Sequence, residues 1–138
     1  MKRKITKFNF NNTLLQERNK EEFKYKTNNR GIVITGYEGN KKDLVIPNKI
    51  ENRVVNAIDD WAFDGYKLTK ITLPSTIKNI GQGAFRDNRL TKVDIPKSVT
   101  FIGWRAFYDN QISSVVIPKS IKTISRNAFD NNVKIVKK

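Results

Sequence analysis

Residues 90–111 read LTKVDIPKSVTFIGWRAFYDNQ, and the stretch before them, residues 68–89, reads LTKITLPSTIKNIGQGAFRDNR. The two stretches are variants of one 22-residue phrase, and a third copy starts at residue 112. Ala-Phe pairs recur with the same spacing at 62–63, 84–85, 106–107 and 128–129. A fixed period of this length is the signature of a repeat architecture, in which each copy stacks on the next.

Each copy opens with a strand pattern. In the central copy the apolar residues are Leu90, Val93 and Ile95, and a proline follows directly. Because strand side chains alternate between two faces, Val93 and Ile95 should point inward while Lys92 and Asp94 point outward. Proline has no N–H and therefore ends the ladder at the same place in every copy. The pattern predicts one strand per copy, with the strands of successive copies aligned in one sheet.

The rest of each copy returns the chain to the next strand. Three and six residues after the proline come two more apolar residues, Val99 and Ile102 in the central copy, and Ala-Phe then fills the far side of the core. A turn column follows, with residue types that tolerate left-handed backbone and cap locally. This column consists of Gly65, Asp87, Asp109 and Asn131, followed by Asn88, Asn110 and Asn132.

The 22-residue period, the phrase I-P-x-S-[IV]-x-x-I-G-x-x-A-F-x-x-N and the short Ala-Phe return together resemble the BspA-like class of leucine-rich repeats. The fold expected from the resemblance is a β-rich repeat solenoid with an N-terminal β-hairpin cap. Its expected parts are an N-terminal extension (1–22), a capping β module (23–46) and an array of about four turns (47–138). The first repeat is longer than the others around residues 50–55, where this family often carries a small hairpin. In the extension, residues 13–18 are expected to form a short helical turn.

Members of the BspA-like class are typically secreted or cell-surface proteins that act in adhesion, host contact or protein binding, so the resemblance implies a non-enzymatic binding module. The basic start of the chain is not followed by an apolar signal segment, and no stretch is apolar enough to span a bilayer. The sequence as given therefore carries no recognisable export signal, and it leaves the localisation open.

The amino-acid composition excludes several kinds of catalytic and metal site. The chain has no cysteine and no histidine, so a disulfide framework, a thiolate metal site and the commonest general base are all excluded. It contains no phosphate-binding loop, nucleophile elbow or cluster of metal ligands. We therefore expect no catalytic residue, no metal and no cofactor.

The charge is strongly positive. Twenty-seven Lys and Arg against thirteen Asp and Glu give +14. Basic side chains stack in columns on successive copies: Lys70 with Lys92, Lys67 with Arg89, and Lys97 with Lys119. One interpretation is solubility and protection against edge-to-edge association. The other is electrostatic binding of a polyanion, either an acidic glycan or a nucleic acid, by Lys67, Arg89, Lys97 and Lys119.

One copy differs from the others by its aromatic residues. Phe101, Trp104 and Tyr108 occupy columns whose other members are polar. Because Trp and Tyr dominate binding energy at interfaces, we predict a site for a protein partner there, with local packing between loops or self-association as the alternative. The outward positions of the strand face are predicted to share in it: Lys70, Thr72, Lys92, Asp94, Ser114 and Val116. Trp61 is expected to cover the top of the first repeat.

The last repeat raises a third hypothesis. An uncapped final turn exposes a strand edge and core, which would favour a homodimer through the C-terminal end or a purely structural assembly unit. Lys137 and Lys138 would counter such association.

Overall fold

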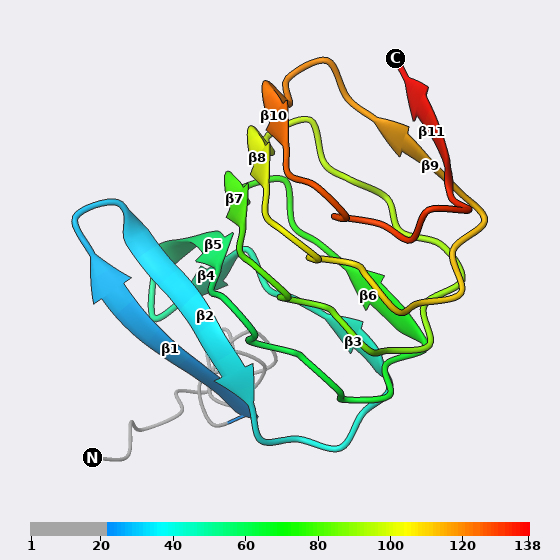
Figure 1. Cartoon of the computed structure of the whole chain (residues 1–138). Coiled ribbons are helices and arrows are strands. Elements are labelled where there is room, and N and C mark those ends of the chain that lie inside the picture. Colours follow the sequence, from blue (N-terminus) through cyan, green and yellow to red (C-terminus); the bar gives the residue numbers. More distant parts are fainter. Residues whose placement is uncertain (1–21) are drawn as a thin grey trace.

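The computed structural model describes residues 22–138, which wind into a solenoid of stacked coils (Figure 1). We call one coil a rung, and number the rungs 44–67, 68–89, 90–111 and 112–133. The predicted helical turn at residues 13–18 and nearly all of the N-terminal extension lie outside the described residues. The described residues form eleven strands: β1 (Phe23–Asn28), β2 (Gly31–Tyr37), β3 (Asp43–Val45), β4 (Lys49–Ile50), β5 (Arg53–Ile58), β6 (Lys70–Thr72), β7 (Asn79–Ile80), β8 (Phe101–Ile102), β9 (Ser114–Ile117), β10 (Thr123–Ile124) and β11 (Lys134–Lys137).

Two hairpins occupy the N-terminal part of the described chain. β1 and β2 pair antiparallel, and β2 then pairs parallel with β5. β4 and β5 form the small hairpin expected in the long first repeat, and its turn residues Glu51 and Asn52 have φ of 49° and 66°. The Tyr25 hydroxyl donates a hydrogen bond to the Glu51 carboxylate over 2.8 Å, which joins the two hairpins.

One side of the solenoid is a continuous parallel sheet. β5, β7, β8 and β10 pair in that order, each with the strand 22 residues further on. Backbone bonds extend these ladders into the following bend, as where the Gly103 N–H donates to the Ile80 carbonyl over 2.8 Å. The sequence predicts only inward-facing apolar residues here, because strands of two residues leave no alternating pattern to detect.

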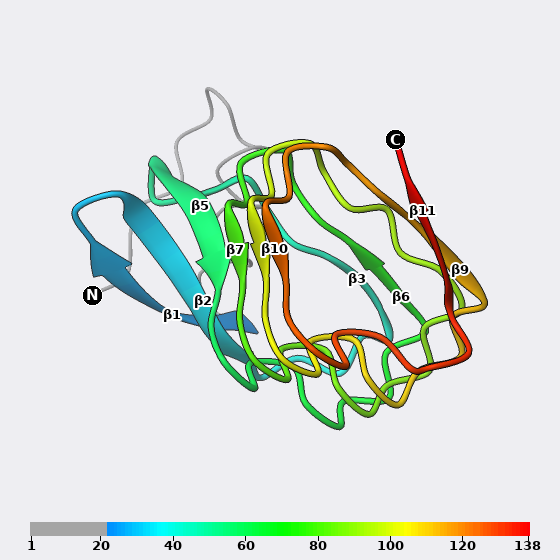
Figure 2. The same ribbon diagram turned by 45° about the horizontal axis from the view of Figure 1, so that its top comes forward.

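The opposite side, which carries the stronger strand pattern, is split. β6 pairs with β3 and β9 pairs with β11, but residues 90–96 of the third rung form no strand between them. Two surface grooves of 340 and 410 Å³ lie on either side of this segment. The prediction of one aligned sheet on this side is therefore wrong at the third rung. Figure 1 shows β7, β8 and β10 side by side, whereas β6 and β9 lie apart on the other side of the solenoid, and Figure 2 shows the same arrangement from a second direction.

Hydrogen bonds of side chains near the grooves also differ at the third rung. The Thr76 and Ser120 hydroxyls each donate to a carbonyl of the preceding rung, over 2.6 and 2.9 Å. Ser98, at the equivalent position of the third rung, has a buried hydroxyl without a hydrogen-bond partner among residues 22–138. The third rung is thus tied to the second along the β7–β8 side and only loosely along the other.

The core is a single file of phenylalanines. Phe63, Phe85, Phe107 and Phe129 stack with ring centroids 5.2, 5.3 and 5.2 Å apart and interplanar angles of 1°, 13° and 6°. The first three are fully buried, as are the alanines at 84 and 106. The predicted 22-residue register is therefore confirmed across all four rungs.

The final coil is shorter than the others. β11 pairs with β9 at Lys134↔Ser114, an offset of 20 residues in place of 22. Ile135 pairs with the buried Val115 but is itself 43% exposed, since within residues 22–138 no strand covers its other side. The apolar pattern thus continues to the end of the array while its burial does not.

Candidate partner-binding surface

The bend that leads into each Ala-Phe pair places one residue per rung in left-handed backbone. This column consists of Trp61, Gly83, Arg105 and Asn127, with φ of 60°, 57°, 55° and 55°. Left-handed backbone costs a residue with a Cβ atom about 1–2 kcal/mol, from which glycine is exempt. The column nevertheless holds a tryptophan and an arginine, and both side chains make contacts beyond their own backbone.

Trp61 lies across Gly83. A Cβ atom on Gly83 would overlap the indole ring, so the ring occupies the space that a side chain of the second rung would need. The ring thereby reaches the third rung and meets Trp104, with centroids 6.4 Å apart and an interplanar angle of 83°. Such an edge-to-face pair is a favourable aromatic geometry. Trp61 nevertheless stays 43% exposed and Trp104 38%, which leaves a broad apolar surface open to solvent.

Arg105 contacts two rings of its own rung. Its Cζ atom lies 4.5 Å from the centroid of the Trp104 ring and 4.9 Å from that of Tyr108, both within cation–π range. The Nε atom is buried and has no hydrogen-bond acceptor among residues 22–138. We call Trp61, Trp104, Arg105 and Tyr108 the aromatic surface.

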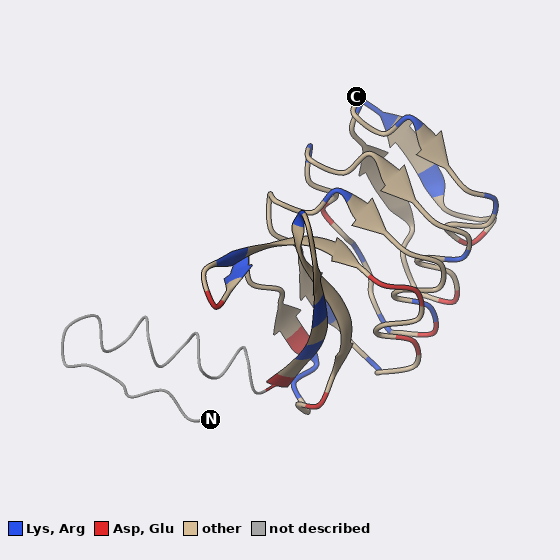
Figure 3. Ribbon diagram, turned by 90° about the vertical axis from the view of Figure 1, so that its left-hand side faces the viewer, with Lys and Arg blue, Asp and Glu red and all other residues tan. Residues whose placement is uncertain are grey.

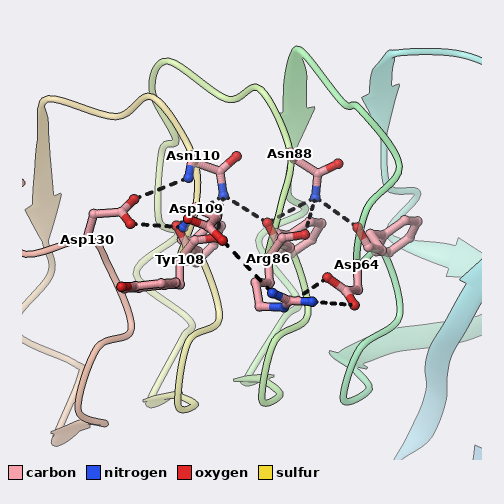
Figure 4. Close-up of polar contacts among 10 residues, drawn as sticks. Asp64, Arg86, Asn88, Tyr108, Asp109, Asn110 and Asp130 are labelled. Carbon is pink, nitrogen blue, oxygen red and sulfur yellow. Dashed lines mark hydrogen bonds and ion pairs between the residues drawn. The ribbon is translucent and has the colours of Figure 1, made fainter.

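Arg86, one rung earlier, is neutralised. Its Nε lies 3.1 Å from Asp64 Oδ1, and a terminal nitrogen donates to Asp64 Oδ2 over 3.3 Å (Figure 4). The other terminal nitrogen lies 3.9 Å from an Asp109 oxygen, so Arg86 bridges three rungs. Its Cζ is also 5.8 Å from the Trp61 ring. Arg86 therefore lies next to the aromatic surface, and its charge is balanced by the carboxylates of Asp64 and Asp109.

Two asparagines fix the bend behind this surface. Asn88 is buried, and its Nδ2 donates to the Phe63 and Phe85 carbonyls over 2.8 and 3.0 Å, while its Oδ1 accepts from the Leu68 N–H over 2.9 Å. Asn110 repeats the pattern one rung later (Figure 4). The turn column was predicted to cap locally, but these amides join adjacent rungs as well.

The structure brings two of the three predicted aromatic residues together. Trp104 and Tyr108 both contact Arg105, but Phe101 lies on β8 between Asn79 and Thr123 and is partly buried. Within the described chain no ring or cation contact joins Phe101 to the other two. Phe101 belongs to the strand ladder, whereas Trp104 lies in the bend that follows β8. Phe101 is therefore not part of the aromatic surface.

The predicted strand-face residues lie on the other side of the coil. All six are exposed: Lys70 and Thr72 on β6, Ser114 and Val116 on β9, and Lys92 and Asp94 in the unpaired segment between them. Because β6 and β9 lie across the core from β8, these residues do not join the aromatic surface (Figure 1). They line the two grooves instead.

The basic columns are exposed as well. Lys67 and Arg89 precede the strand segments, and Lys97 and Lys119 follow the prolines that end them. Lys97 borders the 410 Å³ groove together with Lys92 and Lys138. Figure 3 shows Lys and Arg on the N-terminal hairpin and on the last coil, with acidic residues recurring at the bends.

Sequence reasoning did not assign Trp61 and Arg105 to the site. Both occur in one column with Gly83, and the missing side chain at Gly83 is the signal that could have linked the first rung to the third. Among residues 22–138, no three His, Cys, Asp or Glu side chains gather as a potential metal site. None of the helices in that range has the length and apolar character needed to cross a bilayer.

The parallel ladder at a 22-residue period, the phenylalanine file and the asparagine column define a leucine-rich-repeat solenoid. Proteins of this class are in general protein-interaction scaffolds and are typically not enzymes. More narrowly, the chain belongs to the family of the BspA type Leucine rich repeat region, whose profile matches residues 40–136 in six copies.

Solved structures agree with this assignment. A leucine-rich repeat protein of T. pallidum is similar over 85% of this chain and 62% of its own length, with 26% identity and a TM-score of 0.71. One from Bacteroides capillosus matches over 85% and 94%, with 19% identity and a TM-score of 0.73, and shares the fold. One from Bacteroides ovatus matches over 85% and 40%, with 23% identity and a TM-score of 0.60. The chain thus spans less than two thirds of two of these three relatives. None of the curated proteins matches the chain.

Proposed function

We propose that this chain is a non-enzymatic protein-binding module whose contact surface is the aromatic surface. One observation carries the proposal. The two tryptophans of the chain, from the first and the third rung, meet there and remain 43% and 38% exposed. Trp, Tyr and Arg are the residue types most enriched in binding hot spots, and this surface consists of these three types alone.

Local packing alone accounts poorly for this arrangement. A side chain that serves packing alone should be buried, whereas Trp61 and Trp104 are the two exposed aromatic residues among residues 22–138. Trp61 also holds a left-handed conformation that costs about 1–2 kcal/mol relative to glycine. Strain kept at an exposed aromatic residue supports a role in binding.

The test compares two single variants. Wild-type chain, Trp104→Ala and Val116→Ala are immobilised at equal density, and the bound proteins from a cell-surface extract are quantified. Val116 is a suitable control because it is an apolar side chain, 50% exposed, on β9 of the opposite face. We expect Trp104→Ala to lose at least about tenfold of the captured partner, while Val116→Ala keeps it. Equal capture by all three chains would refute a binding role for the aromatic surface.

A second candidate function is polyanion binding on the β6–β9 side of the solenoid. It is supported by the basic side chains around the larger groove. Lys92, Lys97 and Lys138 border it, against the single carboxylate of Asp94. Retention on immobilised heparin should then fall steeply with salt, and Lys92→Gln with Lys97→Gln should reduce the slope by about one per lysine. Retention that does not change between low and physiological salt would exclude this function.

A further inference from the structure

Arg105 differs from Arg86 in having no counter-ion. Arg86 is paired with Asp64 and lies near Asp109, whereas no carboxylate or carbonyl among residues 22–138 accepts a hydrogen bond from the Arg105 guanidinium. The neighbouring Asp130 is also engaged, because its two oxygens accept the Asp109 and Asn110 N–H groups over 3.0 and 3.2 Å. A guanidinium with five donors and no acceptor is poised for an external anion.

The two rings determine how that anion can approach. Trp104 and Tyr108 lie within 4.5 and 4.9 Å of the Arg105 Cζ and cover the guanidinium group. Its Nε is buried, while the side chain as a whole is partly exposed. The N–H donors of a guanidinium lie in one plane. Two of them can therefore bind the two oxygens of a carboxylate at once.

Beside this charged group lies the open edge-to-face pair of Trp61 and Trp104. A ligand whose carboxylate met Arg105 would have its neighbouring groups over these rings. Planes that meet at 83° offer no common flat face to a sugar ring, but they do form an angle that an aliphatic or aromatic side chain can fill. The net charge of +14 favours an acidic partner in the encounter.

From these contacts we infer that Arg105 is a carboxylate receptor, and that the partner presents an Asp or Glu next to an apolar side chain, the carboxylate to Arg105 and the apolar group to Trp61 and Trp104. This inference rests on the proposed function and adds the chemistry of the partner. Loss of the charge-assisted hydrogen bonds should weaken binding by about tenfold or more.

The experiment uses the full chain and a displayed library of random twelve-residue peptides. The best-binding peptide is synthesised together with analogues in which each Glu is replaced by Gln, or each Asp by Asn. Binding is measured by isothermal titration calorimetry, because that signal does not depend on the two tryptophans of the chain. The proteins compared are wild type, Arg105→Gln, Arg105→Lys, Arg30→Gln and Trp104→Ala, each checked for folding by circular dichroism.

We expect selected peptides to carry an acidic residue beside an apolar one, and wild type to prefer them over the neutral analogues by about tenfold or more. Arg105→Gln should bind acidic and neutral peptides equally, and Arg105→Lys should lose most of the preference because it lacks the planar fork. Arg30→Gln removes the same charge from an exposed site on the N-terminal hairpin and should stay within about twofold of wild type.

Two results would overturn the inference while leaving the proposed function intact: Trp104→Ala weakens binding but Arg105→Gln keeps the acidic preference, or the selected peptides lack acidic residues. Peptide binding that Trp104→Ala does not weaken would overturn the proposed function itself. A heparin oligosaccharide could also displace the peptide. If its own binding falls equally with Arg105→Gln and Arg30→Gln, the surface is a general polyanion surface and not a carboxylate receptor.

Discussion

The Asn88 Nδ2 atom lies 2.8 Å from the carbonyl oxygen of Phe63, a residue of the preceding rung, and the same side chain accepts the Leu68 N–H. Replacing Asn88 with Ala would leave these buried groups without partners. Each unsatisfied group costs about 1–3 kcal/mol, so we expect the free energy of unfolding to fall by about 2–4 kcal/mol. Urea titration of the variant measures this loss.

Asn132 provides the matched control for that substitution. It occupies the same column two rungs later but is exposed, and no hydrogen bond involves its side chain in the described part of the chain. Asn132→Ala should therefore change the unfolding free energy by no more than about 0.5 kcal/mol. Equal losses at the two positions would show that the inter-rung bonds are not what makes Asn88 important.

The phenylalanine file gives a second prediction. Phe107 is fully buried with a stacked ring on each side, at 5.3 and 5.2 Å, so Phe107→Ala should cost about 3–5 kcal/mol. Phe129 has one stacked neighbour and is 6% exposed, and its replacement should cost less. Thermal or urea unfolding distinguishes the two variants. A loss below about 1 kcal/mol at Phe107 would contradict the stacked register.

Trp61 should separate stability from binding. Trp61→Gly removes a half-exposed ring, and it also relieves left-handed backbone by about 1–2 kcal/mol. We therefore expect stability within about 1 kcal/mol of wild type together with a clear loss of partner capture. Asn127→Gly, in the same column, should leave capture unchanged. A stability loss above about 3 kcal/mol would mean that Trp61 serves the core.

Amide hydrogen exchange should detect the break in strand pairing at residues 90–96. The backbone of residues 90–96 has no strand partner on either side, whereas β9 pairs with β11 and β8 lies in the continuous sheet. Amides of Lys92–Ile95 should therefore exchange faster than those of Val115–Ile117, because exchange follows local opening. Equal protection in the two segments would mean that the sheet is continuous in solution.

These features differ in how well the sequence could predict them. The Phe63–Phe129 file follows directly from the period, because equal spacing places equal side chains above one another. The break at residues 90–96 could not be predicted, since Leu90, Val93 and Ile95 match the apolar pattern of the neighbouring copies.

The candidate site was predicted only in part, for a related reason. Trp104 and Tyr108 stand out against polar columns, but their connection depends on Arg105, whose column gives no aromatic signal. Trp61 reaches Trp104 because Gly83 has no side chain, and a glycine in a bend is ordinarily read as a requirement of the backbone alone.

The third rung is held to its neighbours unevenly: β8 pairs with β7 and β10, whereas residues 90–96 pair with neither β6 nor β9. A ligand that approached from the β7–β8–β10 side would therefore meet an unbroken ladder, whereas one on the β6–β9 side would meet two short paired surfaces with a gap between them.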